Sequence, residues 1–206
     1  MILTLPLAPP PWLSRLTELR IDVNQGPKRL DGEIASICDR IRKPGDPLHS
    51  MARIPLNDPD LVIRHREADG EFYVYVEDVR RQQLAGYTVF NRLIEVHRRA
   101  DRYVRAPHSK YDPQYQRRGL ATAVYRWGLD AGLCLLTGAR QSPAAHALWH
   151  KLAAHYEPGW VDLRDKTLTY LGREISPQVL GELHTRMLLL GRGWTLGKFT
   201  AATGMR

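Results

Sequence analysis

Alternating apolar and polar positions mark the middle of the chain. Residues 72–78 alternate with a period of two, and the apolar-rich runs 61–63 and 84–90 flank them. Such alternation is typical of strands that bury one face, and turn-forming residues at 69–70 and 80–81 separate the runs. The pattern predicts consecutive antiparallel strands joined by tight turns.

A spacing of three to four residues predicts helices elsewhere. Apolar residues recur at this interval over residues 31–42 and 122–131, and again after Ser142-Pro143. Ser142 suits the N-cap of the last of these helices, and proline is favoured at a first helical position. The polar, proline-rich residues 43–59 are expected to form a long surface loop.

Two short apolar runs complete the predicted sheet. Residues 133–136 follow a glycine and are continuously apolar, as expected of a strand covered on both faces. Together with the strand ending near Tyr111 and the helix over 122–131, they predict a crossover unit whose ligand lies at the carboxyl end of the first strand. Residues 168–171 are expected to be the last strand.

The C-terminal part is expected to be helical and then loose. Ser176-Pro177 predicts a helix start, because Leu180, Leu183 and Met187 follow at helical intervals. The tail from residue 192 onward is basic and contains glycine, and docking on the domain or on a partner is the alternative to a loose tail.

The loop between residues 111 and 121 predicts an anion site. Asp112-Pro113 closes an extended segment, and Gly119 permits a sharp turn before the helix. Arg117 and Arg118 supply positive charge beside this turn. A phosphate or pyrophosphate could therefore bind at the loop.

The helix that follows the turn supplies hydrogen-bond donors. The amides of Leu120, Ala121 and Thr122 are the first of the helix and have no partner within it. The helix N-terminus also carries a partial positive charge. No Gly-x-x-x-x-Gly-Lys-Ser/Thr or Gly-x-Gly-x-x-Gly spacing is present, so the loop differs from these two phosphate-binding motifs.

The spacing of Gln116, Gly119 and Ala121 resembles the Gln/Arg-x-x-Gly-x-Gly/Ala signature of the GNAT superfamily of acyl-CoA-dependent N-acyltransferases. The approach to the loop, with Pro113 and Tyr115, is similar to that family's strand end. Residues 142–149 are similar to its Asn-x-x-Ala-x-x-Leu/Phe-Tyr helix, and residues 72–90 to its central hairpin. The resemblance covers about residues 70–172.

The resemblance implies an α/β (α+β) fold with a GNAT-like mixed, mostly antiparallel sheet, flanked by helices and splayed between the fourth and fifth strands. It implies acetyl-CoA (coenzyme A) as the cofactor and acyl donor, with its pyrophosphate in the loop. The pantetheine arm would bind strand amides near Ser109 and Tyr111 and pass close to Ser142. The implied cofactor-binding residues are Ser109, Tyr111, Gln116, Arg117, Arg118, Gly119, Leu120, Ala121, Thr122 and Ser142.

The catalytic groups are harder to assign. Many members of the resembled family use a tyrosine of the second helix to reprotonate the departing thiolate, but this chain has Trp149 there, and an indole cannot play that role. Tyr156 is the candidate substitute, with water as the alternative. His108 is the candidate base, since its side-chain pKa lies in the useful range. Strict alternation places His108 on the opposite face from Ser109.

Length and composition fit a single domain over residues 1–206, with an N-terminal arm at 1–12, the best-matched core at 70–172, and a C-terminal helix and basic tail at 173–206. The arm lacks a positive n-region and is rich in proline, so we expect neither a signal nor a membrane span. Two distant cysteines, Cys38 and Cys134, predict no metal site or disulfide framework and suit a reducing cytoplasm.

The net charge of +8 favours an anionic partner, and coenzyme A, nucleic acid and acidic protein surfaces all qualify. The preferred interpretation is an N-acyltransferase that acetylates a primary amine on an acceptor of unknown identity, with a homodimer left open. The first alternative is a nucleic-acid-modifying enzyme of the same fold, resembling phage Mom-type DNA modification proteins or transfer-RNA acetyltransferases; the cationic run 97–105 motivates it. The second is a non-catalytic module that binds coenzyme A.

Overall fold

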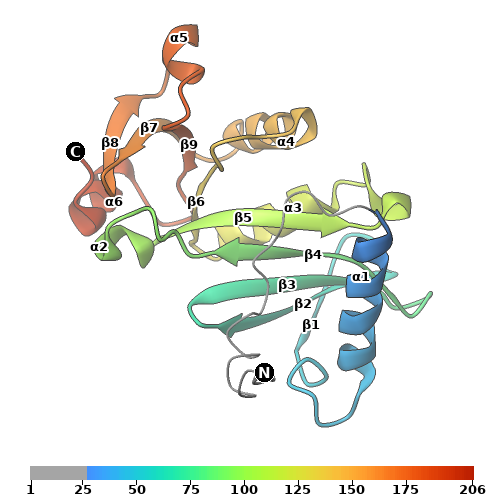
Figure 1. Cartoon of the computed structure of the whole chain (residues 1–206). Coiled ribbons are helices and arrows are strands. Elements are labelled where there is room, and N and C mark those ends of the chain that lie inside the picture. Colours follow the sequence, from blue (N-terminus) through green and yellow to red (C-terminus); the bar gives the residue numbers. More distant parts are fainter. Residues whose placement is uncertain (1–26) are drawn as a thin grey trace, which may run out of the picture.

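A computed structural model describes residues 27–206, in which nine strands form one mixed sheet (Figure 1). The strand order is β1-β2-β3-β4-β5-β6-β9-β7-β8. The strands are β1 (Arg53–Pro55), β2 (Leu61–Ala68), β3 (Glu71–Asp78), β4 (Gln83–Asn91), β5 (Val104–Tyr111), β6 (Cys134–Leu136), β7 (Pro158–Arg164), β8 (Thr167–Gly172) and β9 (Thr185–Leu189). The predicted arm at 1–12 lies outside the described residues.

Helices cover both faces of this sheet. They are α1 (Pro27–Arg42), α2 (Arg98–Asp101), α3 (Leu120–Asp130), α4 (Pro143–Ala153), α5 (Pro177–Leu180) and α6 (Leu196–Thr203), and a 3₁₀ turn, η2, spans Pro113–Tyr115. Alternate residues of β3 contact opposite layers: Val74 packs in the core with α3 and α4, whereas Tyr73 packs in the core with α1. The predicted α/β fold, a mostly antiparallel sheet flanked by helices, is confirmed.

The first five strands form an antiparallel meander, and three of them, β2 to β4, are the strands that the alternating pattern predicted. The turn between β2 and β3 places Asp69 and Gly70 at positive φ, and the turn after Asp78 joins β3 to β4. The expected loop over 43–59 differs in one respect, because β1 forms within it and pairs with β2. Every helix in the described range is too short or too polar to cross a bilayer.

The predicted crossover unit and splay are confirmed in β5, α3 and β6; the splay lies between the fifth and sixth strands because β1 adds a strand that was not predicted. β5 and β6 run parallel, but they pair only at Val104↔Cys134 and Arg105↔Leu135. From Ala106 to Tyr111, β5 pairs with β4 alone. Among residues 27–206, this part of β5 therefore has no strand partner on its β6 side, which is the predicted opening.

The predicted third helix is largely wrong. Ser176 does cap a helix by accepting a hydrogen bond from the Val179 amide (3.4 Å), but α5 ends after one turn at Leu180. Met187 lies instead in β9, which is buried along its whole length between β6 and β7. Residues 168–171 form part of β8, at the sheet edge, and β9 is the last strand. A continuous apolar run suits a buried strand as well as a helix, so the interval alone misled the prediction.

The tail is ordered and docked on the domain, so the expectation of a loose tail is wrong. Helix α6 is capped by Thr195, and Phe199 and Met205 are buried in the core beneath β7 and β8. Backbone hydrogen bonds also join Arg206 to Leu168 and to Tyr170. The apolar residues are too widely spaced among basic and small ones for the pattern to reveal this helix.

Candidate functional site

The loop after β5 is fixed by its own side chains. Asp112 accepts a hydrogen bond from the Gln114 amide (2.9 Å) and so caps η2. The Gln116 side chain donates from Nε2 to the Tyr111 carbonyl (3.0 Å). Gln116 therefore braces the loop against the end of the strand, a role beyond the anion contact that the resemblance implies.

The backbone then turns sharply before α3. Arg117 has a φ of +59° and Gly119 a φ of +79°, both left-handed, and α3 begins at Leu120 without a side-chain cap. Turns that use such conformations direct successive amides to one side and bind anions. An added Cβ at Gly119 would meet nothing within 4 Å, so open space lies against the backbone here. The two left-handed residues and the uncapped helix start agree with the expected anion cradle, which stays a prediction.

The remaining predicted loop residues lie in this turn and in the first turn of α3. Gln116, Arg117 and Arg118 are exposed, whereas Leu120 turns into the core and offers only its amide. Ala121 and Thr122 are half-buried in the first turn of α3. Arg118 is also paired with Asp58 (2.9 Å), so an arriving phosphate would share this guanidinium or displace the carboxylate.

Tyr115 anchors the loop to the β3–β4 turn. Its side chain is 1% exposed, and its hydroxyl donates to Asp78 Oδ2 (2.7 Å) and accepts from Gln83 Nε2 (2.6 Å). Burial acts to raise the pKa of Asp78, but hydrogen bonds from the Arg81 amide and the Tyr115 hydroxyl outweigh it and lower that pKa.

Two arginines gather on the Tyr115 ring. The guanidinium carbon of Arg118 lies 5.2 Å from the ring centroid and that of Arg81 5.9 Å from it. The sequence marked Arg81 only as part of a hairpin turn. Its proximity to the cradle depends on the pairing of β3 with β4 and of β4 with β5, which the motif could not reveal.

One face of β5 carries a cluster of hydroxyl groups. Thr88 of β4 lies opposite Ser109, and their hydroxyl oxygens are 2.7 Å apart. The Tyr111 hydroxyl lies 3.3 Å from Thr88 Oγ1, and Ser109 donates to the Tyr125 hydroxyl of α3 at 3.4 Å. Thr88, Tyr111 and Tyr125 are buried and Ser109 is half-buried. Sequence analysis missed Thr88 and Tyr125, since neither belongs to the loop motif.

Helix α4 borders the opening from the β6 side. Ser142 accepts a hydrogen bond from the Ala145 amide (3.2 Å), so it is the N-cap that the sequence predicted, and it is exposed. Trp149 is 4% exposed and packs edge-on against Tyr125, with ring centroids 6.0 Å apart. The tryptophan therefore fills the core next to the hydroxyl cluster.

His108 lies on the other face of β5, as the alternation predicted. Its Nε2 atom is buried and has no hydrogen-bond partner in the described part of the chain. Burial, and then the charge of Lys110, lowers the pKa of His108 below 6.5, while Glu33 of α1 opposes the shift. Glu33 forms an ion pair with Lys110 (3.0 Å) and accepts a hydrogen bond from the Tyr87 hydroxyl (2.7 Å). These three polar side chains therefore lie together beneath α1.

Tyr156 lies at the opposite end of α3 from the cradle. Its hydroxyl donates to Asp130 Oδ1 (3.0 Å), and Arg192 pairs with the same carboxylate (3.4 Å). α3 has eleven residues and is about 16 Å long at 1.5 Å per residue, so its length separates Tyr156 from the loop. The structure thus brings Ser109 and Tyr111 close to the loop, but not Tyr156.

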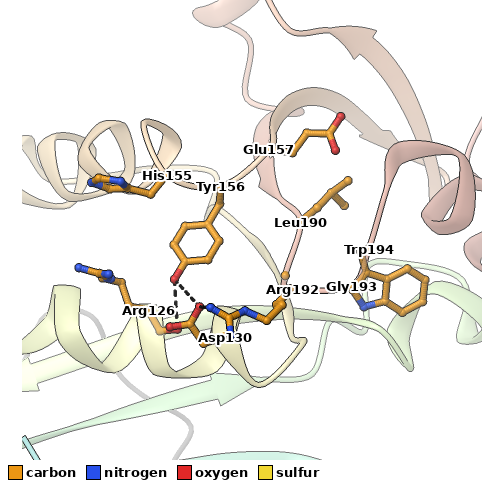
Figure 2. A pocket seen from close by; sticks show the side chains of 10 residues that line it. Arg126, Asp130, His155, Tyr156, Glu157, Leu190, Arg192, Gly193 and Trp194 are labelled. Carbon is orange, nitrogen blue, oxygen red and sulfur yellow. Dashed lines mark hydrogen bonds and ion pairs between the residues drawn. The ribbon is translucent and has the colours of Figure 1, made fainter.

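Tyr156 also forms one wall of a pocket of about 340 Å³ (Figure 2). In Figure 2 the tyrosine points down toward Asp130 and Arg126, and Trp194 stands on the other side. Burial, and then the hydrogen bond to Asp130, raises the pKa of Tyr156. The pocket is lined by Arg126, Asp130, His155, Tyr156, Glu157, Leu190, Gly191, Arg192, Gly193 and Trp194. These contacts close the C-terminal end of α3, where cations and hydroxyl donors satisfy terminal carbonyls.

The chain matches no protein-family model and no curated protein. Similar solved structures include a GNAT-superfamily phosphinothricin acetyltransferase from Sinorhizobium meliloti in complex with AcCoA, at 20% identity over 60% of this chain and 63% of that one, with a TM-score of 0.37. The chain thus spans less than two thirds of that enzyme.

Two further similar structures are also acyltransferases. A spermidine N-acetyltransferase from Vibrio cholerae in complex with CoA and spermine matches at 18% identity, over 60% of this chain and 67% of that one, with a TM-score of 0.34. A cAMP-binding acyltransferase from Mycobacterium smegmatis matches at 9% identity, over 87% of this chain and 59% of that one, with a TM-score of 0.43. These likenesses are distant, and a role for this chain must rest on its own strands, loop and side chains.

Proposed function

We propose that this protein is an acyl-CoA-dependent N-acyltransferase that moves an acetyl or similar acyl group to a primary amine. The observation that carries the proposal is the anion cradle at the N-terminus of α3, placed at the end of a strand whose edge is open toward β6. A long ligand with a pyrophosphate at one end and a hydrogen-bonding chain at the other would fit both features. Coenzyme A has this construction.

The cradle would hold the pyrophosphate through the amides that follow Arg117. Arg117 and Arg118 add charge to the exposed rim, and Arg81 adds a third guanidinium beside Tyr115. The free β5 edge between Ala106 and Tyr111 offers backbone groups to the pantetheine arm, as the resemblance implies. When bound, acetyl-CoA supplies an acyl group already activated as a thioester, so positioning provides most of the rate enhancement.

His108 is proposed as the base that takes a proton from the acceptor amine. Its lowered pKa keeps the imidazole neutral near pH 7, which is the form that accepts a proton. Its Nε2 atom is free of protein partners within residues 27–206. The acceptor would then approach from the α1 side of β5, opposite the hydroxyl cluster. We place the reaction in the cytoplasm.

The nucleic-acid alternative is supported by the net charge of +8, and by Arg98 and Arg102, which are exposed. Other members of the run 97–105 serve the fold. Arg99 donates to the Ala201 and Ala202 carbonyls of α6, and Arg105 is buried. The run is therefore a weaker nucleic-acid surface than its sequence indicates. The non-catalytic alternative rests on Trp149, which replaces the expected tyrosine.

Two measurements on the full chain test the proposal. Coenzyme A and acetyl-CoA should raise the melting temperature, because a ligand that binds only the folded state stabilises it by mass action. Mass spectrometry of a panel of primary amines, incubated with protein and acetyl-CoA, should then reveal an acylated product. A melting temperature that is unchanged at millimolar ligand would count against the site. Binding without transfer to any amine would favour the non-catalytic module, and salt-sensitive retention on DNA or RNA the nucleic-acid alternative.

A further inference from the structure

A cluster of hydroxyl groups from β4, β5 and α3 lies in the interior of the protein. Thr88, Ser109, Tyr111 and Tyr125 bond to one another, and three of the four are buried. Burying hydroxyls is costly unless they are paired, and apolar residues of similar size would fill this space without that requirement. The cluster is therefore better explained by chemistry than by packing.

The cluster lies where the sheet opens. Ser109 is four residues beyond Arg105, the last residue of β5 that pairs with β6. Within the cluster, the Tyr111 hydroxyl is bonded to Thr88, on the β4 side of β5. Tyr125 packs between Phe90 of β4 and Trp149 of α4, the helix that follows β6, with ring centroids 6.0 Å apart in each pair. Of the two phenols, Tyr125 is thus the one that also contacts the helix after β6.

The Tyr125 hydroxyl retains a proton that it can donate. Its oxygen accepts a hydrogen bond from Ser109 (3.4 Å), and in the described part of the chain Tyr125 donates no hydrogen bond of its own. Burial raises the pKa of Tyr125 to about 12, although the bond from Ser109 works to lower it. The phenol is therefore fully protonated at neutral pH.

We propose that Tyr125 is the general acid of the acyl transfer, and that it delivers its proton to the leaving sulfur; this inference rests on the proposed function. The amine nitrogen forms a bond to the thioester carbonyl carbon and loses a proton to the base. The C–S bond then breaks, its electron pair stays on sulfur, and the Tyr125 proton moves to that sulfur. Ser109 returns a proton to the tyrosinate and takes one from water, since its side chain is half-buried.

The other candidates are less well placed. The Trp149 indole has only an N–H group, which is not acidic enough to protonate a thiolate. Tyr156 lies at the far end of α3 and is bonded to Asp130. The arrangement also explains why a tryptophan is acceptable on α4: its ring holds the Tyr125 ring in place, and α3 provides the hydroxyl.

The test is the ionisation of the coenzyme A thiol when it is bound to the full chain. A donated hydrogen bond favours the thiolate, so the wild type should lower the pKa of the bound thiol, measured by the ultraviolet absorbance of the thiolate. Tyr125→Phe keeps the ring and removes the donor, and the bound thiol should then titrate at higher pH. The kcat of Tyr125→Phe should fall by about 10²-fold, the scale typical of a general acid.

Two further variants make the result specific. Tyr103→Phe removes a hydroxyl from a half-buried tyrosine in the core beneath β7 and β8, and it should leave the thiol titration as in the wild type. Tyr156→Phe tests the rival acid, and a raised thiol pKa there, with none in Tyr125→Phe, would overturn the assignment. An unchanged thiol pKa in folded Tyr125→Phe that still binds coenzyme A would also overturn it.

The inference and the proposed function fail in different ways. Coenzyme A that does not raise the melting temperature of the wild type defeats the proposed function and this inference together. Binding with no response to Tyr125→Phe defeats only the inference. If Tyr125→Phe does not fold, 3-fluorotyrosine introduced at position 125 retains the shape of the side chain and donates more strongly. The bound thiol should then titrate at lower pH than in the wild type, and an unchanged titration would refute the role.

Discussion

Replacing Gly119 with alanine tests the cradle directly. Gly119 has φ +79° and ψ 8°, a left-handed conformation that costs a non-glycine residue about 1–2 kcal/mol. The added Cβ would meet nothing within 4 Å, so we expect no collision beyond this backbone penalty. For a chain of this size the penalty lowers the melting temperature by roughly 2–8 °C.

Gly45 provides a matched control for this change. It has a φ of +85°, it also has nothing within 4 Å of an added Cβ, and it lies in the exposed loop after α1. Gly45→Ala should therefore cost about as much stability as Gly119→Ala. The two variants differ in one respect: only at Gly119 would the new methyl group project into the space where the amides receive an anion.

The assay is a melting curve with and without acetyl-CoA. At a ligand concentration of 100 times Kd the stabilisation is about 2.7 kcal/mol, which raises the melting temperature by roughly 5–10 °C. The wild type and Gly45→Ala should show this rise, and Gly119→Ala should show little or none. An undiminished rise in Gly119→Ala would mean that the ligand binds elsewhere. Equal stability of all three proteins would refute the left-handed turns themselves.

Three other changes probe the surroundings of the cradle. Alanine at both Arg117 and Arg118 should weaken coenzyme A binding by about 1–3 kcal/mol in calorimetry. The loss should be smaller for dephospho-coenzyme A if one of the two arginines contacts the 3′-phosphate. Equal losses for the two ligands would place both arginines away from that phosphate. Tyr115→Phe removes the hydroxyl that donates to Asp78 Oδ2 and should lower the free energy of unfolding by about 1–3 kcal/mol in urea, whereas a neutral effect would show that water replaces the hydroxyl. Because the pKa of His108 is lowered in the folded protein, the free energy of unfolding should fall as the pH drops below about 6.5, where the unfolded chain binds the proton first, until the folded pKa is reached. His108→Gln should flatten that part of the stability profile and remove the acidic limb of the kcat/KM profile. An unaltered kcat/KM profile would exclude His108 as the base.

The sequence was most informative where a local rule determined the backbone. Gly119 lies at positive φ, and Ser142 and Ser176 are N-caps, because a turn or a helix start restricts the residue types allowed at those positions. Met187 lies in a strand rather than a helix because β9 is buried between β6 and β7. No pattern within the segment encodes that position in the sheet.

The hydroxyl cluster could not be predicted for a related reason. Thr88 and Ser109 are 21 residues apart in the chain, and they meet because β4 and β5 pair in one register. Tyr125 joins them from α3, whose apolar face predicted a buried side chain but not the partner of its hydroxyl. Side-chain chemistry assembled across elements is invisible to a search for motifs within one segment.

The short seam between β5 and β6 has a mechanical consequence. Within residues 27–206, β5 and β6 pair at Val104↔Cys134 and Arg105↔Leu135, and no other strand pairing joins the two halves of the sheet. We expect the two halves of the sheet to tilt against each other more easily at this short seam than along a fully paired strand. A ligand that contacts both sides of the open edge would hold the two halves of the sheet together. Amide hydrogen exchange in β6 and β9 should then slow when the ligand binds, although these strands lie away from the cradle.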